Sequence, residues 1–155
     1  MLGFDCRRRR RGAEQTGLNT LLLSASATPV PDIVALAATA QNDGILQITG
    51  SNAFAVATVN VGASASITAT ATTGAATLPL SISLCQTDPM SGQCISSIGS
   101  SVTTTIDANA TPTFAIFATA SGAVSFLPQT NRIFVEFSDA NEVVRGSTSV
   151  AVETQ

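Results

Sequence analysis

The sequence contains no histidine, lysine, tryptophan or tyrosine. Without His or Lys, the common Ser–His and Ser–Lys arrangements for nucleophilic catalysis cannot form. Three cysteines without histidine give no tetrahedral set of soft-metal ligands, and no Gly-rich loop leads from a strand into a helix to cradle a phosphate. All seven aromatic residues are phenylalanine, which usually belongs to a core rather than to a sugar-stacking surface. We therefore expect no catalytic residue, no cofactor and no metal, and we expect that the protein is not an enzyme.

Charge is also scarce, because only 11% of the residues are charged, whereas about a quarter is usual. Five of the seven basic residues form one run, residues 7–11, and without that run the chain would carry a formal charge of −8. Such an acidic chain is a poor partner for a phosphate backbone, and a lone basic run is more often a targeting segment or a solvated terminus. We expect no nucleic-acid partner. No apolar run approaches the roughly 18–20 residues of a membrane span, so no transmembrane segment is expected.

Residues 1–28 differ in character from the rest of the chain. The arginine run, a short apolar stretch at 18–23 and small residues at 24–27 resemble a degenerate secretory signal, although Glu14, Gln15 and Asn19 interrupt it. A mis-assigned start, upstream of a domain normally preceded by more protein, is the alternative. We expect this segment to be disordered or weakly helical, with Cys6 incidental, and residues 29–155 to form a single domain.

From Pro31 onward the chain alternates between short strand patterns and turn residues. The clearest strand is 64–72, where Ser and Thr alternate with Ala65, Ile67, Ala69 and Ala71; this gives one dry face, and the small alanines indicate a bulky neighbour. Turn residues recur at the 8–12-residue spacing of a sandwich or barrel; turns are predicted at 42–44, 107–110 and 139–142, and a bulge or kink at Gly146. We therefore predict an all-β fold, an antiparallel β-sandwich of about eight to ten short strands. The expected strands are 32–40, 45–48, 54–61, 64–72, 78–84, 102–106, 113–120, 133–138 and 143–152.

Residues 78–98 are predicted to form a strand, a tight polar loop and a returning strand, with Cys85 and Cys94 opposite each other. A disulfide between Cys85 and Cys94 would close a loop of about ten residues and stabilise the fold by roughly 2.5 kcal/mol. Two free buried thiols or a redox pair are the alternatives. Pro79 places the first strand at a sheet edge or a bulge, since proline cannot donate to a ladder. A structural disulfide favours an oxidising compartment, so we expect a secreted or cell-surface protein.

Two turns carry the residues that hard cations prefer, at Asp107 with Asn109 and at Asp139 with Asn141 and Glu142. Carboxylate and carbonyl oxygens of loops are the usual calcium ligands, but neither turn has the dense acidic pattern of a calcium loop. Stabilisation of the turn by the aspartate's own hydrogen bonds is the alternative.

Five stretches resemble the Ig-like β-sandwich modules of large secreted or surface-exposed bacterial proteins. They are VPDIVALAAT, FAVATVNVGASASITATA, LPLSISLCQTDPMSGQC, TIDANATPTFAIF and NRIFVEFSDANEVVRGSTSVAVETQ. The tryptophan and inter-sheet disulfide of antibody-type domains are missing, and the resemblance carries over no functional residues. It implies a non-catalytic structural or adhesive module, acting as a spacer or interaction domain. The alternative is a glycan- or protein-binding module that uses loops such as 85–94 and 122–131. Expected partners are a protein or glycan at the cell surface, or neighbouring modules.

Overall fold

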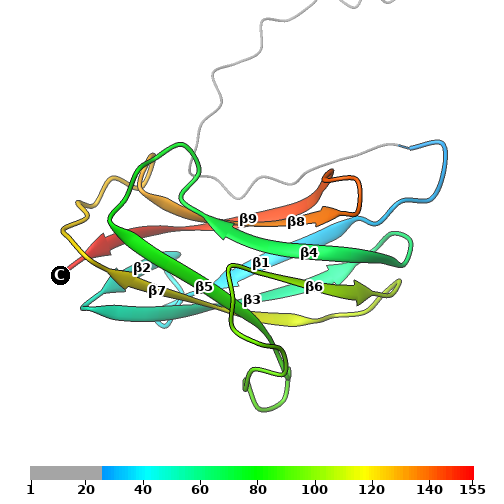
Figure 1. Cartoon of the computed structure of the whole chain (residues 1–155), viewed down its shortest axis with the longest axis horizontal. Coiled ribbons are helices and arrows are strands. Elements are labelled where there is room, and N and C mark those ends of the chain that lie inside the picture. The colour runs from blue at the N-terminus through cyan, green and yellow to red at the C-terminus, as the bar shows by residue number, and fades with distance from the viewer. Residues whose placement is uncertain (1–25) are drawn as a thin grey trace, which may run out of the picture.

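A computed structural model of the chain describes residues 26–155, in which β-strands are the only regular secondary structure (Figure 1). The predictions for Cys6, for residues 7–11 and for the signal-like stretch lie outside the described residues. The nine strands fall within the predicted eight to ten. They are β1 (Ile33–Ala38), β2 (Ile45–Ile48), β3 (Ser51–Asn60), β4 (Ala65–Thr72), β5 (Leu80–Thr87), β6 (Ser101–Ile106), β7 (Thr113–Ala120), β8 (Arg132–Asp139) and β9 (Val144–Thr154).

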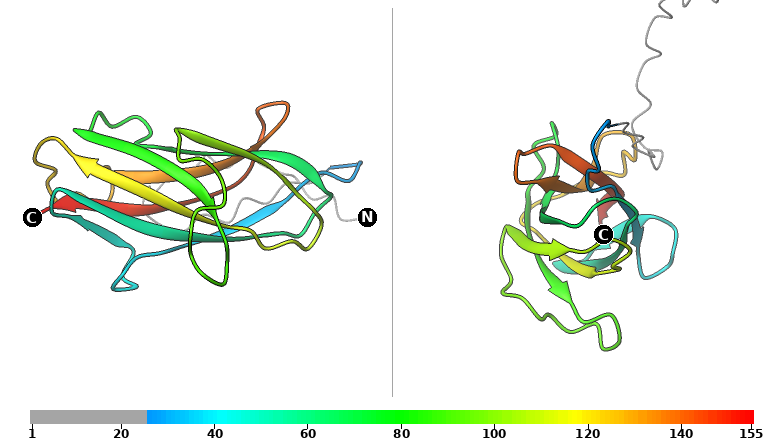
Figure 2. Two further views of the ribbon diagram at one scale, coloured as in Figure 1. Left: turned by 60° about the horizontal axis from the view of Figure 1, so that its bottom comes forward. Right: turned by 90° about the vertical axis from the view of Figure 1, so that its right-hand side faces the viewer.

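The strands form a four-stranded sheet in the order β1-β3-β7-β5 and a five-stranded sheet in the order β2-β9-β8-β4-β6. Figure 2 shows one sheet lying over the other, with the strands of both running roughly along the length of the molecule. Every pairing is antiparallel except that of β2 with β9, which is parallel. The prediction of purely antiparallel sheets was therefore wrong for this pair. After β1 the chain crosses from the four-stranded sheet to the five-stranded sheet, where β2 pairs with β9. The prediction missed this pairing because the alternation of residues within a strand shows which side is buried, not which strand lies beside it.

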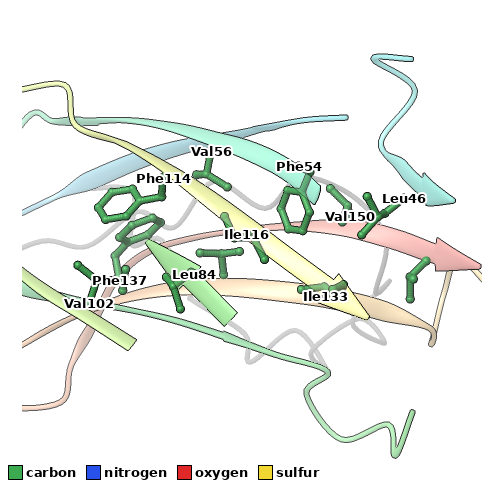
Figure 3. Packing of buried hydrophobic residues seen from close by; sticks show 14 of the residues in the cluster. Leu46, Phe54, Val56, Leu84, Val102, Phe114, Ile116, Ile133, Phe137 and Val150 are labelled. Atoms are coloured by element: carbon green, nitrogen blue, oxygen red, sulfur yellow. The ribbon is translucent and has the colours of Figure 1, made fainter. Parts of the chain in front are cut away.

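Both sheets contribute to one hydrophobic core (Figure 3). Phe114 of β7 and Phe137 of β8 meet there with ring centroids 5.4 Å apart and planes inclined at 59°. This tilted contact joins the two sheets near the centre of the cluster. The alternation predicted for residues 64–72 is confirmed, since Ile67 and Ala69 are buried, and the bulky neighbour of Ala69 is its register partner Phe137.

Three turns use left-handed backbone at residues other than glycine. Asn42, Asn109 and Glu142 have φ values of 56°, 64° and 61°. Asn tolerates this conformation better than most residues, which is why the predicted turns at 42–44 and 107–110 form where expected. The predicted turn at 139–142 also forms, although there a glutamate adopts the positive φ.

Gly146 lies beside the bulge in the β8–β9 pairing, where the register shifts between Phe137 and Ser138. The bulge predicted at this glycine is therefore confirmed. A Cβ atom at position 146 would collide with the backbone carbonyl of Ile33. The missing side chain thus lets β1, an edge strand of one sheet, approach β9 of the other.

Candidate functional site

The most distinctive local feature is the segment 88–100, which follows β5 and is attached to it covalently. A disulfide joins Cys85 to Cys94, with Cα atoms 5.7 Å apart. Cys85 is fully buried, whereas Cys94 is exposed. Leu84 belongs to the core, so by strand alternation Cys85 points to the opposite, outer face of the four-stranded sheet. The disulfide therefore holds the 88–100 loop against the outside of that sheet.

The predicted returning strand after Cys94 is wrong. Only two isolated bridges, Thr87–Cys94 and Leu84–Gly99, connect this segment to β5. The residues QCISSIG lack a two-residue alternation, and the Ser96 hydroxyl accepts the Gln86 amide at 2.9 Å where a ladder would use a carbonyl. The Ser96 hydroxyl has taken the place of a backbone carbonyl as the acceptor for Gln86, so the segment after Cys94 does not form a regular strand.

The loop nevertheless occupies the free edge of β5. Leu84 and Gly99 exchange two backbone hydrogen bonds of 2.8 and 3.1 Å, and the Ile95 amide donates to the Gln86 carbonyl at 2.8 Å. β5 is the last strand of its sheet, as Pro79 predicted. The edge-facing backbone groups of Leu84 and Gln86 are therefore already bonded within the chain.

Asp88 fixes the tip of the loop. Its carboxylate accepts hydrogen bonds from the amides of Ser91 at 2.8 Å and Met90 at 2.9 Å. These hydrogen bonds, with that from the Ser91 hydroxyl, hold the pKa of the Asp88 carboxyl below its usual value. Gly92 completes the turn with a φ of 70°. The tip of the loop therefore has a defined conformation, which its own hydrogen bonds hold in addition to the disulfide.

Three large apolar side chains of the loop face solvent. Met90 is 94% exposed, Ile95 62% and Ile98 59%. Both isoleucines lie in the stretch predicted to be a returning strand, so the sequence did not identify them as surface residues. Their three-residue spacing, which does not fit a strand, was the available signal. A rigid loop that presents apolar side chains is suited to contact with another protein surface.

The second loop proposed for binding, 122–131, also exposes apolar side chains, with Phe126 47% and Leu127 54% exposed. The expectation that phenylalanines belong to the core is wrong for Phe126. Antiparallel pairing of β5 with β7 places Thr87 beside Thr113 and Leu80 beside Ala120. The 88–100 loop follows Thr87 and the 122–131 loop follows Ala120, so the two lie at opposite ends of the sheet and do not form one site.

Arg132 supports the 122–131 loop and was not singled out from the sequence. It is only 6% exposed, and its guanidinium donates to the Pro128 carbonyl at 2.9 Å and to the Ser149 hydroxyl and carbonyl at 3.0 and 3.2 Å. Burial lowers the pKa of Arg132. These neutral acceptors fix the loop to β9, which is a structural role.

The two candidate calcium turns lie at the same end of the five-stranded sheet, on strands either side of β4. Two strand spacings, about 10 Å, separate them, which is too far for one ion to bind both. Asp139 forms an ion pair of 2.6 Å with Arg145 and accepts the Asn141 and Val143 amides. Asp107 accepts the Ser64 hydroxyl at 2.6 Å. Residues 26–155 contain no group of three His, Cys, Asp or Glu side chains placed to hold a metal ion.

Two surface hollows lie over the described residues. One of about 370 Å³ is bordered by residues 26–30, Asp32, Val61 and Gly62. Another of about 320 Å³ lies between Ile48, Gly50, Ala120 and the end of β9. Neither brings together a pair of acidic side chains, so neither has the arrangement that general acid–base catalysis by carboxylates needs.

Neither a protein-family model nor a curated protein sequence matches this chain. Among the described residues, no helix has the length and apolar character needed to cross a membrane.

Proposed function

We propose that this chain is a non-catalytic structural or adhesive module of a secreted or cell-surface bacterial protein, acting as a spacer or interaction domain. The observation that carries the proposal is the disulfide-anchored 88–100 loop on an all-β scaffold. Disulfides persist in oxidising compartments and are rare in reducing ones. A loop held by both a disulfide and backbone hydrogen bonds keeps its shape without a partner.

The strand order supports an Ig-like β-sandwich. β1-β3-β7-β5 corresponds to the A-B-E-D sheet of immunoglobulin domains, and β9-β8-β4 corresponds to G-F-C. β6 takes the place beside C that variable-type domains fill with an additional strand. Two features depart from that family. The strand beside C, β6, comes after the strand at the place of D, β5, whereas the additional strand of variable-type domains comes before D. The disulfide lies at the sheet edge rather than between B and F.

A loop-based binding module is the second candidate, and the exposure of Met90, Ile95 and Ile98 favours it. These side chains offer apolar area but no hydrogen-bonding groups, so they suit a protein surface better than a glycan. The two candidates share a compartment and differ in whether the loop contacts a partner.

The test of compartment and disulfide is intact mass of native protein from fractionated cells, with and without reductant. We expect the protein in an extracytoplasmic fraction, with a mass that rises by two hydrogen atoms on reduction of Cys85–Cys94. Recovery from the cytoplasm with free thiols would contradict the proposal.

The test of spacer against binder uses beads coated with the purified protein and their retention on cells from the same culture. The double variant Ile95→Asp/Ile98→Asp removes the apolar character of the loop, and Thr103→Asp on the five-stranded sheet is the matched control. Retention lost only with the loop variant supports the binding module. Retention that is equal for all three proteins supports the spacer.

A further inference from the structure

The four-stranded sheet contains no charged residue in any of its strands β1, β3, β5 and β7. Charged side chains do occur in the other sheet and in the loops, where the described chain has eight acidic and two basic residues. Alternation with the buried residues identifies the side chains that point outward from β1, β3 and β7. The apolar ones are Val34, Leu36, Ala38, Ala53, Ala55, Ala57, Val59, Ala115 and Phe117. We call this set the apolar face.

The register makes the apolar face continuous. Leu36 lies beside Ala57, and Ala38 lies beside Ala55, which lies beside Ala115 of β7. Val34 is 41% exposed and Leu36 62%, and Ala55 and Ala57 are also exposed. The disulfide and the 88–100 loop border this surface on the β5 side. No strand or loop of residues 26–155 covers its centre.

The outer face of the five-stranded sheet has the opposite character. β4 and β6 there present Ser and Thr, and the hydroxyls of Thr68 and Thr103 are hydrogen-bonded at 2.8 Å. Glu136 of β8 also lies on this side, together with Phe134. Strands of similar length in one domain thus have a water-compatible outer face on one sheet and an apolar one on the other. Strand formation alone therefore does not require the apolar face.

We propose that the apolar face docks against the same face of a second copy of this chain, forming a two-fold symmetric dimer. A charged partner would lose hydration without gaining a counter-charge, and a glycan would find few hydrogen-bonding groups. A second copy matches the face because both surfaces are uncharged and apolar. The inference deepens the interaction-module proposal and rests on it.

The shape of the face also suits self-association. Leu36 and Phe117 stand on either side of Ala55 along a diagonal of the sheet. Alanines at the centre allow two sheets to approach to about 10 Å, and the larger side chains fill the space around them. In a two-fold contact each copy supplies both the projecting and the small residues.

The size of the face predicts the strength of the dimer. The three strands of the apolar face measure roughly 14 Å by 27 Å from standard strand spacing and rise. That is about 380 Å² of projected sheet per copy and about 760 Å² for the pair, below the roughly 1,000 Å² at the low end of specific interfaces. The dimer is therefore weak and depends on protein concentration.

The experiment is sedimentation velocity of the full chain from about 10 µM to about 1 mM, spanning weak protein–protein affinities. The wild type is expected to show a dimer fraction that rises with concentration. Leu36→Lys and Ala57→Glu each bury an unpaired charge and are expected to raise the dissociation constant at least about tenfold. Thr103→Lys, on the opposite face, is the matched control and is expected to leave it unchanged.

A second measurement keeps the test decisive if a variant folds poorly. Backbone amide shifts of the wild type, followed by NMR over the same concentrations, are expected to change in β1, β3 and β7 and not in β4 or β6. A monomer at every concentration, or shifts confined to the five-stranded sheet, would overturn the inference. A monomer that instead binds lipid vesicles or another apolar protein would assign the face to that partner. An extracytoplasmic, disulfide-bonded monomer would overturn the dimer alone, whereas a reduced cytoplasmic protein would overturn the proposed function.

Discussion

Cys85 of β5 and Ala115 of β7 are register partners on the outer face of the four-stranded sheet, so the disulfide to Cys94 lies outside the hydrophobic core. The disulfide attaches the 88–100 loop to the four-stranded sheet and does not join the two sheets to each other. Its loss should therefore loosen the 88–100 segment and leave the core intact.

Replacing both cysteines, as Cys85→Ala/Cys94→Ala, is expected to lower the free energy of unfolding by about 2.5 kcal/mol, because the unfolded chain regains loop entropy. Urea unfolding measures this difference. Far-UV circular dichroism should still report a β-protein, and hydrogen exchange should quicken at the amides of Ile95 and Gly99. A variant that loses all its β-structure would contradict a peripheral role for the disulfide.

Asn60 is fully buried, and its amide makes four hydrogen bonds. It donates to the carbonyls of Ala63 and Ile106 and accepts the amides of Asp32 and Gly62, at 2.8 to 3.1 Å. One side chain thus joins the start of β1, the β3–β4 turn and the end of β6.

Asn60→Ala is expected to cost about 2–4 kcal/mol of stability, since it leaves several partly buried backbone groups without partners. Chemical denaturation measures the loss. Asn52→Ala, which removes an exposed side chain from the same strand, is the control and should cost far less. Equal losses for the two variants would show that the Asn60 network does not stabilise the fold.

Gly146→Ala is expected to destabilise the protein by about 1–3 kcal/mol or more, because the new methyl group collides with the Ile33 backbone. Gly99→Ala is the matched control, since its nearest neighbour would be the Ser101 carbonyl at an ordinary 3.5 Å. Thermal unfolding of both variants tests the prediction. A Gly146 variant as stable as the wild type would mean that β1 can move away from β9 at no cost.

Acid should destabilise the fold through its turn aspartates. Burial raises the pKa of Asp139, but hydrogen bonds from Arg145, Val143 and Asn141 outweigh it and hold that pKa below the usual 3.8. The pKa values of Asp43 and Asp88 are lowered as well, chiefly by backbone amides. A carboxyl whose pKa is lower in the folded state stabilises above its unfolded pKa, and this contribution is lost as pH falls through the folded value.

We therefore expect the free energy of unfolding to be level near neutral pH and to fall below about pH 5. Asp139→Asn should be less stable than the wild type at pH 7, and the gap should narrow as pH drops. Urea midpoints measured from pH 7 to pH 2 provide the comparison. A gap that stays constant with pH would show that the charge of Asp139 contributes nothing.

Local patterns predicted the strands well. The expected strand 113–120 coincides with β7, and β4 differs from its expected range by one residue. In β4, alternation of apolar and small polar residues records which side faces the core, whereas β7 is apolar on both sides and was delimited by Pro112 before it and Gly122 after it. The turns at 42–44 and 107–110 were also predictable, because Asn and Gly are the residues that most readily adopt the positive φ that these turns need.

What the sequence did not predict depends on partners far along the chain. The parallel pairing of β2 with β9 joins segments about a hundred residues apart. The burial of Arg132 depends on Pro128 and Ser149 being brought around it. The 88–100 loop looked like a strand because its isoleucines favour one, yet a serine hydroxyl took the place of a ladder carbonyl.

The 88–100 loop also affects what the chain exposes when the fold opens transiently. Exposed sheet edges are templates on which neighbouring chains add strands and propagate fibrils. Along Leu84–Gln86 of β5 the loop already occupies that template, and the Cys85–Cys94 bond keeps the loop tethered even when its hydrogen bonds break. Reduction therefore costs more than loop entropy, because it frees the β5 edge to nucleate aggregation.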